Sequence, residues 1–132
     1  MVLDKQPRAL IVDDSRVARA MIARALDGAY EIEQADCAEA GLETLASSEA
    51  FAVLIVDWNM PGMSGVEFVR ELRKSGKHPD LKILMITTEV EGDSVGIALD
   101  AGVDEYLMKP FVTASVLEKL AILELPVEKA RA

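Results

Sequence analysis

The stretch FAVLIVDWNMPGM, residues 51–63, carries the pattern on which the fold assignment depends. Residues 51–56 are all apolar, which is typical of a strand that is covered on both faces of a parallel sheet. Asp57 follows where such a strand should end, and Pro61-Gly62 predicts a tight turn just beyond it. The stretch therefore predicts a buried strand that places one carboxylate at the edge of a sheet.

Short apolar runs and helical patterns alternate along the rest of the chain. Besides residues 51–56, strands are predicted over 9–12, 30–35, 81–86 and 105–108. Segments with helical spacing follow these strands at 15–26, from 36 onward, at 65–76, at 94–102 and at 113–125. Five strands alternating with five helices predict an α/β fold, a doubly wound, flavodoxin-like parallel sheet with helices on both faces.

Three of the predicted helices have recognisable start signals. Ser15 is a predicted N-cap, while Asp36 and Ser64 each open a capping box with a glutamate three residues later. The helix at 94–102 is the weakest, because Gly96 interrupts it and glycine costs about 1 kcal/mol relative to alanine inside a helix.

Length and composition limit the possible classes of protein. The 132 residues are expected to form one domain, with a core at about 7–125 and a frayed tail at 126–132. The net charge of −9 disfavours non-specific nucleic-acid binding, which needs a basic surface. No apolar run approaches the ~20 residues that cross a bilayer, and the N-terminus lacks a signal-peptide pattern, so a cytoplasmic protein without membrane contact is expected. The single cysteine, Cys37, is expected to be a small core residue or a helix-start residue.

Polar side chains follow four of the five predicted strands. Asp13 and Asp14 follow the first strand, Asp57 the third, Thr87 the fourth and Lys109 the fifth. If the strand order is 2-1-3-4-5, these strands are neighbours and their carboxyl ends form one rim, where α/β folds bind ligands. Carboxylates that meet there repel each other, and a hard cation such as Mg²⁺ relieves the repulsion. A carboxylate beside Mg²⁺ can attack phosphorus and form an aspartyl phosphate, with a lysine as countercharge.

Taken together, these motifs resemble the receiver domains of two-component response regulators over about residues 7–125. The matching segments are the acidic pair 13–14, Asp57 with MPGM at 60–63, the threonine pair 87–88 and KPF at 109–111. The segments DWNMPGMSG and AGVDEYLMKPF are most similar to the stand-alone chemotaxis receiver. The resemblance implies a signalling protein that is not a dedicated enzyme but catalyses its own phosphotransfer and autodephosphorylation, with Mg²⁺ as cofactor.

The resemblance implies a role for each polar residue of the rim. Asp57 is the phosphoacceptor, and Lys109 pairs with the phosphoryl group. Asp14 binds Mg²⁺ directly and Asp13 acts mainly through water. Asp57 and the backbone carbonyl of Asn59 complete the protein ligands.

A second set of residues is implied to act in switching and in phosphate lifetime. Thr87 is the switch hydroxyl, drawn toward the phosphoryl group, and Tyr106 is the switch aromatic that moves inward as Thr87 moves. Asn59 and Glu89 tune the lifetime of the phosphate, which is expected to be nearer seconds to minutes than hours. The Lys109-Pro110 peptide bond is expected to be cis.

The partners are implied by the same resemblance. Phosphate is expected from a histidine kinase or its phosphotransfer domain, and the output face is expected to comprise the segments 94–102, 105–108 and 113–125. The chain is expected to be a monomer. It departs from the stand-alone type at Thr88, where alanine is frequent, and in the acidic segment 89–96. The downstream target therefore stays open between a flagellar motor switch protein and a different protein.

Three other classes of protein share parts of this pattern. An EF-hand loop starting at Asp57 needs a glutamate at its twelfth position, where this chain has Phe68. A haloacid-dehalogenase-like phosphatase uses a second aspartate two residues after its nucleophile, and Asn59 cannot act as that acid or base. A flavodoxin-like FMN carrier needs a Ser/Thr/Gly-rich phosphate loop in place of the acidic pair 13–14. A phosphate sink or a scaffold receiver without direct output remains the alternative function.

Overall fold

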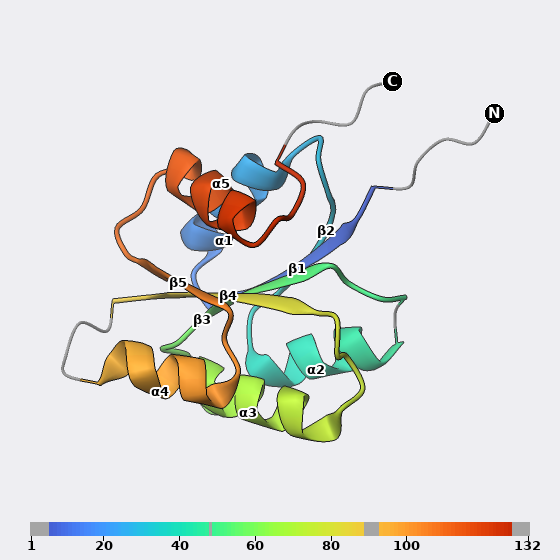
Figure 1. The fold of residues 1–132 in the computed structure, drawn as a ribbon, viewed down its shortest axis with the longest axis vertical. Coiled ribbons are helices and arrows are strands. Elements are labelled where there is room, and N and C mark those ends of the chain that lie inside the picture. The colour runs from blue at the N-terminus through green and yellow to red at the C-terminus, as the bar shows by residue number, and fades with distance from the viewer. Residues whose placement is uncertain (1–5, 48, 89–92, 128–132) are drawn as a thin grey trace.

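The computed structural model describes residues 6–47, 49–88 and 93–127, and it has helices on both faces of a parallel sheet (Figure 1). The strand order is β2-β1-β3-β4-β5, which confirms the predicted topology. The strands are β1 (Arg8–Val12), β2 (Glu31–Ala35), β3 (Val53–Asp57), β4 (Lys82–Thr87) and β5 (Glu105–Met108). The helices are α1 (Arg16–Leu26), α2 (Ala38–Ser47), α3 (Gly65–Ser75), α4 (Ser94–Ala101) and α5 (Thr113–Ile122). Within these ranges, no helix combines the length and apolar character needed to cross a membrane.

Two apolar clusters fill the spaces between the sheet and its helices. One cluster joins the sheet to α1 and α5, and it includes Ile22 and Leu120. The other joins the sheet to α2, α3 and α4, and it includes Phe68. Alternate residues along the central strand β3 contribute to opposite clusters, as the period of two along a strand requires. This two-sided burial is why residues 51–56 are apolar throughout.

The central strands extend beyond their apolar runs by one polar residue. β3 includes Asp57, which is paired with Ile86 of β4, and β4 includes Thr87, which is paired with Met108 of β5. The Trp58 backbone N–H donates to the Ile86 carbonyl oxygen at 3.2 Å, so the ladder of hydrogen bonds continues to the strand end. Asp57 and Thr87 are therefore held by the sheet itself and not by flexible loops.

Two predicted helix starts are confirmed and one is wrong. The Ser15 hydroxyl accepts the Ala18 N–H at 3.1 Å, and Ser64 forms the expected capping box at the start of α3. Asp36 does not cap α2. It is exposed and lies directly after β2, one residue too early, so that Cys37 takes the position before the helix. The Ala40 N–H lies 3.5 Å from the Cys37 sulfur, which gives Cys37 the helix-start role.

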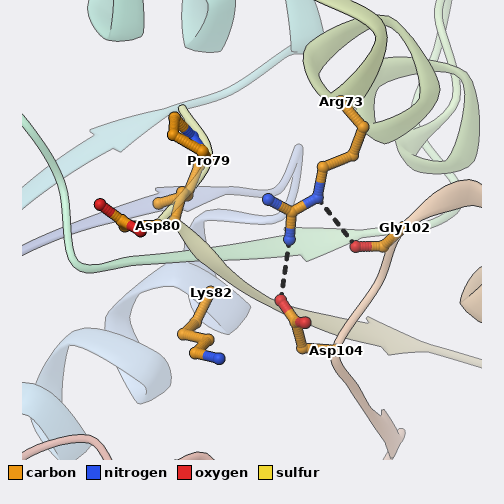
Figure 2. A pocket seen from close by; sticks show the side chains of 7 residues that line it. Arg73, Pro79, Asp80, Lys82, Gly102 and Asp104 are labelled. Carbon is orange, nitrogen blue, oxygen red and sulfur yellow. Dashed lines mark hydrogen bonds and ion pairs between the residues drawn. The ribbon is translucent and has the colours of Figure 1, made fainter. Parts of the chain in front are cut away.

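Arg73 of α3 lies at the amino-terminal ends of β4 and β5, opposite the strand ends that carry Asp57 and Thr87. It contacts Gly102 and Asp104, the residues that connect α4 to β5 (Figure 2). Its Nε donates to the Gly102 carbonyl oxygen at 3.0 Å, and its Nη2 lies 2.8 Å from the Asp104 carboxylate. The same Asp104 oxygen accepts the Ile83 N–H at 2.8 Å. Gly102 has a φ of +116°, and a Cβ there would lie 2.5 Å from Arg73 Cγ. This Arg73 clamp, formed by Arg73, Gly102 and Asp104, fixes the C-terminal end of α4 against α3.

The C-terminal end of the described chain packs back onto the first half of the fold. The buried Tyr30 hydroxyl donates to the Pro126 carbonyl oxygen at 2.7 Å. Burial raises the pKa of Tyr30 to about 12, so its hydroxyl stays protonated. Pro126, the first residue of the segment expected to fray, is thus held by a hydrogen bond.

Candidate functional site

Polar side chains meet at the carboxyl ends of four neighbouring strands. Asp13 directly follows β1, Asp57 ends β3, Thr87 ends β4 and Lys109 directly follows β5. Asp13, Asp57 and Thr87 are 1 %, 5 % and 0 % exposed. Buried carboxylates are stable only when they are paired, hydrogen-bonded or bound to a cation. The rim therefore concentrates negative charge that needs a compensating positive charge.

The Lys109 ammonium bridges the two buried carboxylates. Its Nζ lies 3.2 Å from Asp13 Oδ2 and 3.4 Å from Asp57 Oδ1. The second Asp13 oxygen, Oδ1, accepts the Ser15 N–H at 2.8 Å, and Arg19 Nη1 donates to the Asp13 backbone carbonyl at 2.6 Å. These contacts fix the orientation of Asp13 and hold one ammonium group beside Asp57.

Asp14 adds a third carboxylate to the rim. One oxygen from each of Asp13, Asp14 and Asp57 lies within 4.8 Å of the others, and Asp14 is exposed while the other two are buried. These are hard anionic oxygen donors, the ligand type that Mg²⁺ prefers. The exposed side of the group leaves access for the water molecules that Mg²⁺ usually keeps. The donor set therefore fits a magnesium ion.

The surroundings of Asp57 raise the pKa of its carboxyl group from 3.8 to about 6. Burial is the largest cause, and the negative charge of Asp13 adds to it. The Lys109 ammonium and a backbone hydrogen bond from Asn59 act in the opposite direction. Since burial disfavours the charged form, the ionised carboxylate of Asp57 is held at a free-energy cost that a bound cation would reduce.

Gly65, which the sequence analysis did not single out, supports the backbone of Asp57. A Cβ at this position would lie 2.1 Å from the Asp57 carbonyl oxygen and 3.0 Å from Trp58 Cα. The Gly65 N–H also donates to the Trp58 carbonyl oxygen at 2.8 Å. The available signal was a glycine in the first turn of a helix, where it is unfavourable unless packing requires it. Here the requirement is the close approach of α3 to the end of β3.

A side-chain contact that the sequence did not predict joins Asn59 to Thr88. Asn59 Nδ2 lies 3.5 Å from Thr88 Oγ1, a long and weak hydrogen bond between the segment after β3 and the segment after β4. Thr88 is one of the positions where the chain departs from the stand-alone type. Its hydroxyl contacts one of the two residues implied in phosphate lifetime. The other, Glu89, lies outside the described residues.

Tyr106 lies inside the fold, between the sheet and α4. It is 8 % exposed, is paired with Met85 of β4, and belongs to the same apolar cluster as Ala98 of α4. The Lys109-Pro110 peptide bond just beyond β5 is cis, as the resemblance implied. The inward position of Tyr106 connects β5 to the helix that covers this edge of the sheet.

Comparison with known proteins identifies the family of the chain. A family model for the response regulator receiver domain matches residues 9–121. The chain belongs to this receiver family. The receiver is 39 % identical over 115 residues to a chemotaxis protein CheY homolog of Campylobacter jejuni, an alignment that covers 86 % of this chain and 88 % of the relative.

Solved structures agree with this assignment. The receiver matches the chemotaxis response regulator CheY4 of Vibrio cholerae with a TM-score of 0.83 and 33 % identity, covering 90 % of this chain and 99 % of that one. It also matches a Burkholderia pseudomallei response regulator, solved with a phosphorylated aspartic acid and a calcium ion, with a TM-score of 0.76 and 30 % identity. That match covers 87 % of this chain and 66 % of the other.

Membership of the receiver family indicates the function of the polar side chains at the rim. Receiver domains are signalling proteins that bind Mg²⁺ at an acidic pocket, and those of the chemotaxis type interact with histidine kinases and downstream targets. The group Asp13, Asp14 and Asp57 is the acidic pocket of this receiver. Two-component signalling, and not phosphatase chemistry, is the function that this fold and pocket support.

Proposed function

We propose that this receiver accepts a phosphoryl group on Asp57 from the phosphohistidine of a histidine kinase or its phosphotransfer domain. The observation that carries the proposal is the position of Lys109 Nζ, 3.4 Å from Asp57 Oδ1. Asp57 belongs to a cluster of three carboxylates that each place one oxygen within 4.8 Å of the others. An acceptor carboxylate, a cation-binding group and a fixed ammonium thus share one rim. Phosphoryl transfer depends mainly on such positioning and on stabilisation of charge.

In the proposed transfer, an Asp57 carboxylate oxygen attacks phosphorus while the P–N bond to the donor histidine breaks. The electron pair of that bond leaves with the ring nitrogen, and a donor ring protonated on its second nitrogen leaves as neutral imidazole. Lys109 stabilises the negative charge of the transferred oxygens. Asp14 directly, Asp13 through water, Asp57 and the Asn59 backbone carbonyl would hold Mg²⁺, which would supply further positive charge when bound.

The proposed output is a change of the face formed by α4, β5 and α5. The Thr87 hydroxyl donates a hydrogen bond to the phosphoryl group, and Tyr106 follows the movement of Thr87, which biases a two-state equilibrium. The receiver core at about 7–125 carries this switch as a monomer, in the cytoplasm, and its downstream target is a protein of a chemotaxis-type or other two-component pathway. The burial of Tyr106 in the apolar cluster that also contains Ala98 of α4 supports this coupling.

Labelling with a small phosphodonor tests the acceptor. Phosphoramidate and Mg²⁺ should phosphorylate the wild-type chain on one residue, detected as a mass increase that is labile to acid, alkali and hydroxylamine, and Asp57→Asn should remain unlabelled. Trp58, the single tryptophan and the neighbour of Asp57, should change its fluorescence with Mg²⁺ and again with beryllofluoride. Stoichiometric labelling of Asp57→Asn would exclude Asp57 as the acceptor. A labelled chain whose output face shows no change would indicate a phosphate sink.

The phosphate on Asp57 is proposed to last seconds to minutes, with Asn59 and Glu89 setting the lifetime. Because the Thr88 hydroxyl contacts Asn59 at 3.5 Å, Thr88→Val should change the rate of phosphate loss, whereas Thr88→Ser should keep it close to wild type. Release of phosphate from the purified, labelled chain measures both. Equal rates in all three proteins would remove Thr88 from this role, and a phosphate stable for many hours would contradict the proposed lifetime.

A further inference from the structure

The apolar residues that α4 exposes are larger than those that it buries. The inward residues of α4 are small, whereas its large apolar residues are exposed to 48 %, 40 % and 50 % for Val95, Ile97 and Leu99. A helix that packs only against its own sheet has the opposite distribution, with large apolar residues inward. Exposed apolar residues grouped on one element mark a binding surface. Val95 and Leu99 lie four residues apart on one side of the helix, and we refer to this pair as the α4 apolar side.

The chain around the α4 apolar side is strongly acidic. Residues 88–127 contain eight acidic and two basic side chains. Of the two basic residues, Lys109 lies in the phosphoacceptor site, and Lys119 is paired with Glu105 at 3.2 Å. Asp93 and Asp100, at the two ends of α4, are exposed. A partner that covers the α4 apolar side therefore meets the exposed carboxylates of Asp93 and Asp100, whereas Asp104 and Glu105 are paired with Arg73 and Lys119.

The α4 apolar side is also connected to the proposed switch. The N-terminal end of α4 follows the segment after Thr87, and its N-cap residue, Asp93, makes no side-chain capping hydrogen bond. The C-terminal end is fixed by the Arg73 clamp. Ala98, on the inward side, shares an apolar cluster with Tyr106. Movement of Thr87 and Tyr106 would thus shift the N-terminal part of α4, because the C-terminal end of α4 is fixed by the Arg73 clamp.

We propose that the α4 apolar side is the docking surface for a cationic, amphipathic partner segment. Its apolar residues would cover Val95 and Leu99, which share one side of the helix because they are four residues apart. Its lysine or arginine residues would face Asp93 and Asp100. Complementary charge of this kind selects partners and speeds their encounter. The inference rests on the proposed function in one respect, that phosphorylation of Asp57 controls the affinity of this surface.

Two fluorescein-labelled amphipathic helical peptides of equal length test the proposal, one built from leucine and lysine and the other from leucine and glutamate. Fluorescence anisotropy measures their binding to the full chain in Mg²⁺, with and without beryllofluoride. The Leu/Lys peptide should bind about fivefold or more tightly with beryllofluoride, within the usual range of coupling between sites. The Leu/Glu peptide should bind at least about tenfold more weakly, because like charges oppose each other.

Matched variants separate this surface from general attraction to an acidic protein. Val95→Asn with Leu99→Asn should weaken the Leu/Lys peptide about tenfold, as expected for central apolar contacts. Val17→Asn with Met21→Asn is the control, since this pair on α1 has the same spacing and is also exposed but has arginine neighbours. Peptide binding should be unchanged there. Asp100→Lys, an exposed substitution that leaves the apolar residues intact, should weaken the Leu/Lys peptide and strengthen the Leu/Glu peptide.

Several results would overturn the inference. The chain could bind neither peptide, or it could prefer the Leu/Glu peptide. It could also bind the Leu/Lys peptide equally well with and without the substitutions at Val95 and Leu99. Dimerisation in sedimentation experiments that is lost on substituting Val95 and Leu99 would assign the surface to a second copy of the chain. Labelling of Asp57 by phosphoramidate keeps the two proposals apart. If Asp57 is labelled but the peptide results fail, only the docking inference falls; if labelling fails, the phosphorylation proposal falls, and peptide binding without beryllofluoride still decides the surface.

Discussion

The buried carboxyl group of Asp57 makes the stability of the metal-free chain depend on pH. Its pKa is about 6 in the fold and 3.8 as the ordinary value, so the folded state binds the proton more tightly than the unfolded state. The stability that this tighter proton binding contributes is fully present below the unfolded pKa, and it is lost as the pH rises through the folded pKa. At neutral pH in EDTA, Asp57→Asn should therefore raise the free energy of unfolding, by up to about 3 kcal/mol.

Urea unfolding at several pH values measures this effect. The advantage of Asp57→Asn should shrink as the pH falls from about 7 to about 4, because the wild-type carboxyl group then becomes protonated in the fold. Asp80→Asn is the control, since Asp80 is exposed and precedes β4, at the end of the sheet opposite the rim. A gain that is independent of pH would mean that it does not come from the ionisation of Asp57.

A methyl group at position 65 should disturb the acceptor strand. Gly65→Ala would place Cβ 2.1 Å from the Asp57 carbonyl oxygen, so the start of α3 or the end of β3 must shift. Overpacking of this kind typically costs about 1–3 kcal/mol. The matched control is Gly96→Ala in α4, where a Cβ meets no atom within 4 Å. That change should be neutral or stabilising by up to about 1 kcal/mol, because alanine favours helix. Chemical unfolding compares the two, and equal effects would argue against the close contact.

The sequence predicts which individual residues meet at the strand ends, but it does not predict which residues meet through the loops. Asp13, Asp57 and Lys109 were predictable, because parallel strands end at a common edge and the register follows from burial on both faces. The Asn59–Thr88 contact and the Gly65 approach depend on the path of the segments after β3. That path has no periodic signal in the sequence.

The Arg73 clamp should contribute measurably to the attachment of α4 and β5. Asp104→Ala removes the acceptor for both the Arg73 guanidinium and the Ile83 N–H. Because the Asp104 and Arg73 side chains are only 31 % and 25 % exposed, we expect a loss of about 1–2 kcal/mol. The control is Glu33→Ala, which breaks the ion pair of Arg8 with the 41 % exposed Glu33 and should cost about 1 kcal/mol or less. Urea unfolding measures both, and a smaller loss for Asp104→Ala would contradict the clamp.

The boundaries of whole elements follow hydrogen bonds that apolar patterns do not contain. β5 was predicted at its observed limits, but α5 ends at Ile122 and not at residue 125. The chain turns there because Glu124 has a φ of 60° and the Leu125 N–H bonds back to the Leu120 carbonyl oxygen at 2.9 Å. Leu125 is apolar because it packs against the cluster beneath α1 and α5, although it lies outside the helix. The apolar period thus predicted burial correctly and the helix end incorrectly.

For the whole molecule, Mg²⁺ should stabilise the fold, because its ligands come together only when β1 and β3 are paired. A ligand that binds only the folded state stabilises it by RT ln(1 + [L]/Kd), which is about 1.4 kcal/mol at a tenfold excess over the dissociation constant. Thermal unfolding of the wild-type chain should therefore shift upward with MgCl₂ and saturate. Asp14→Asn keeps the buried Asp13–Lys109 pair but removes the exposed carboxylate, so the Mg²⁺-dependent shift should be largely lost. NaCl at matched ionic strength separates binding from screening of the −9 net charge. If Mg²⁺ stabilised Asp14→Asn as much as the wild type, the acidic group would be a source of general charge repulsion and not a specific cation site.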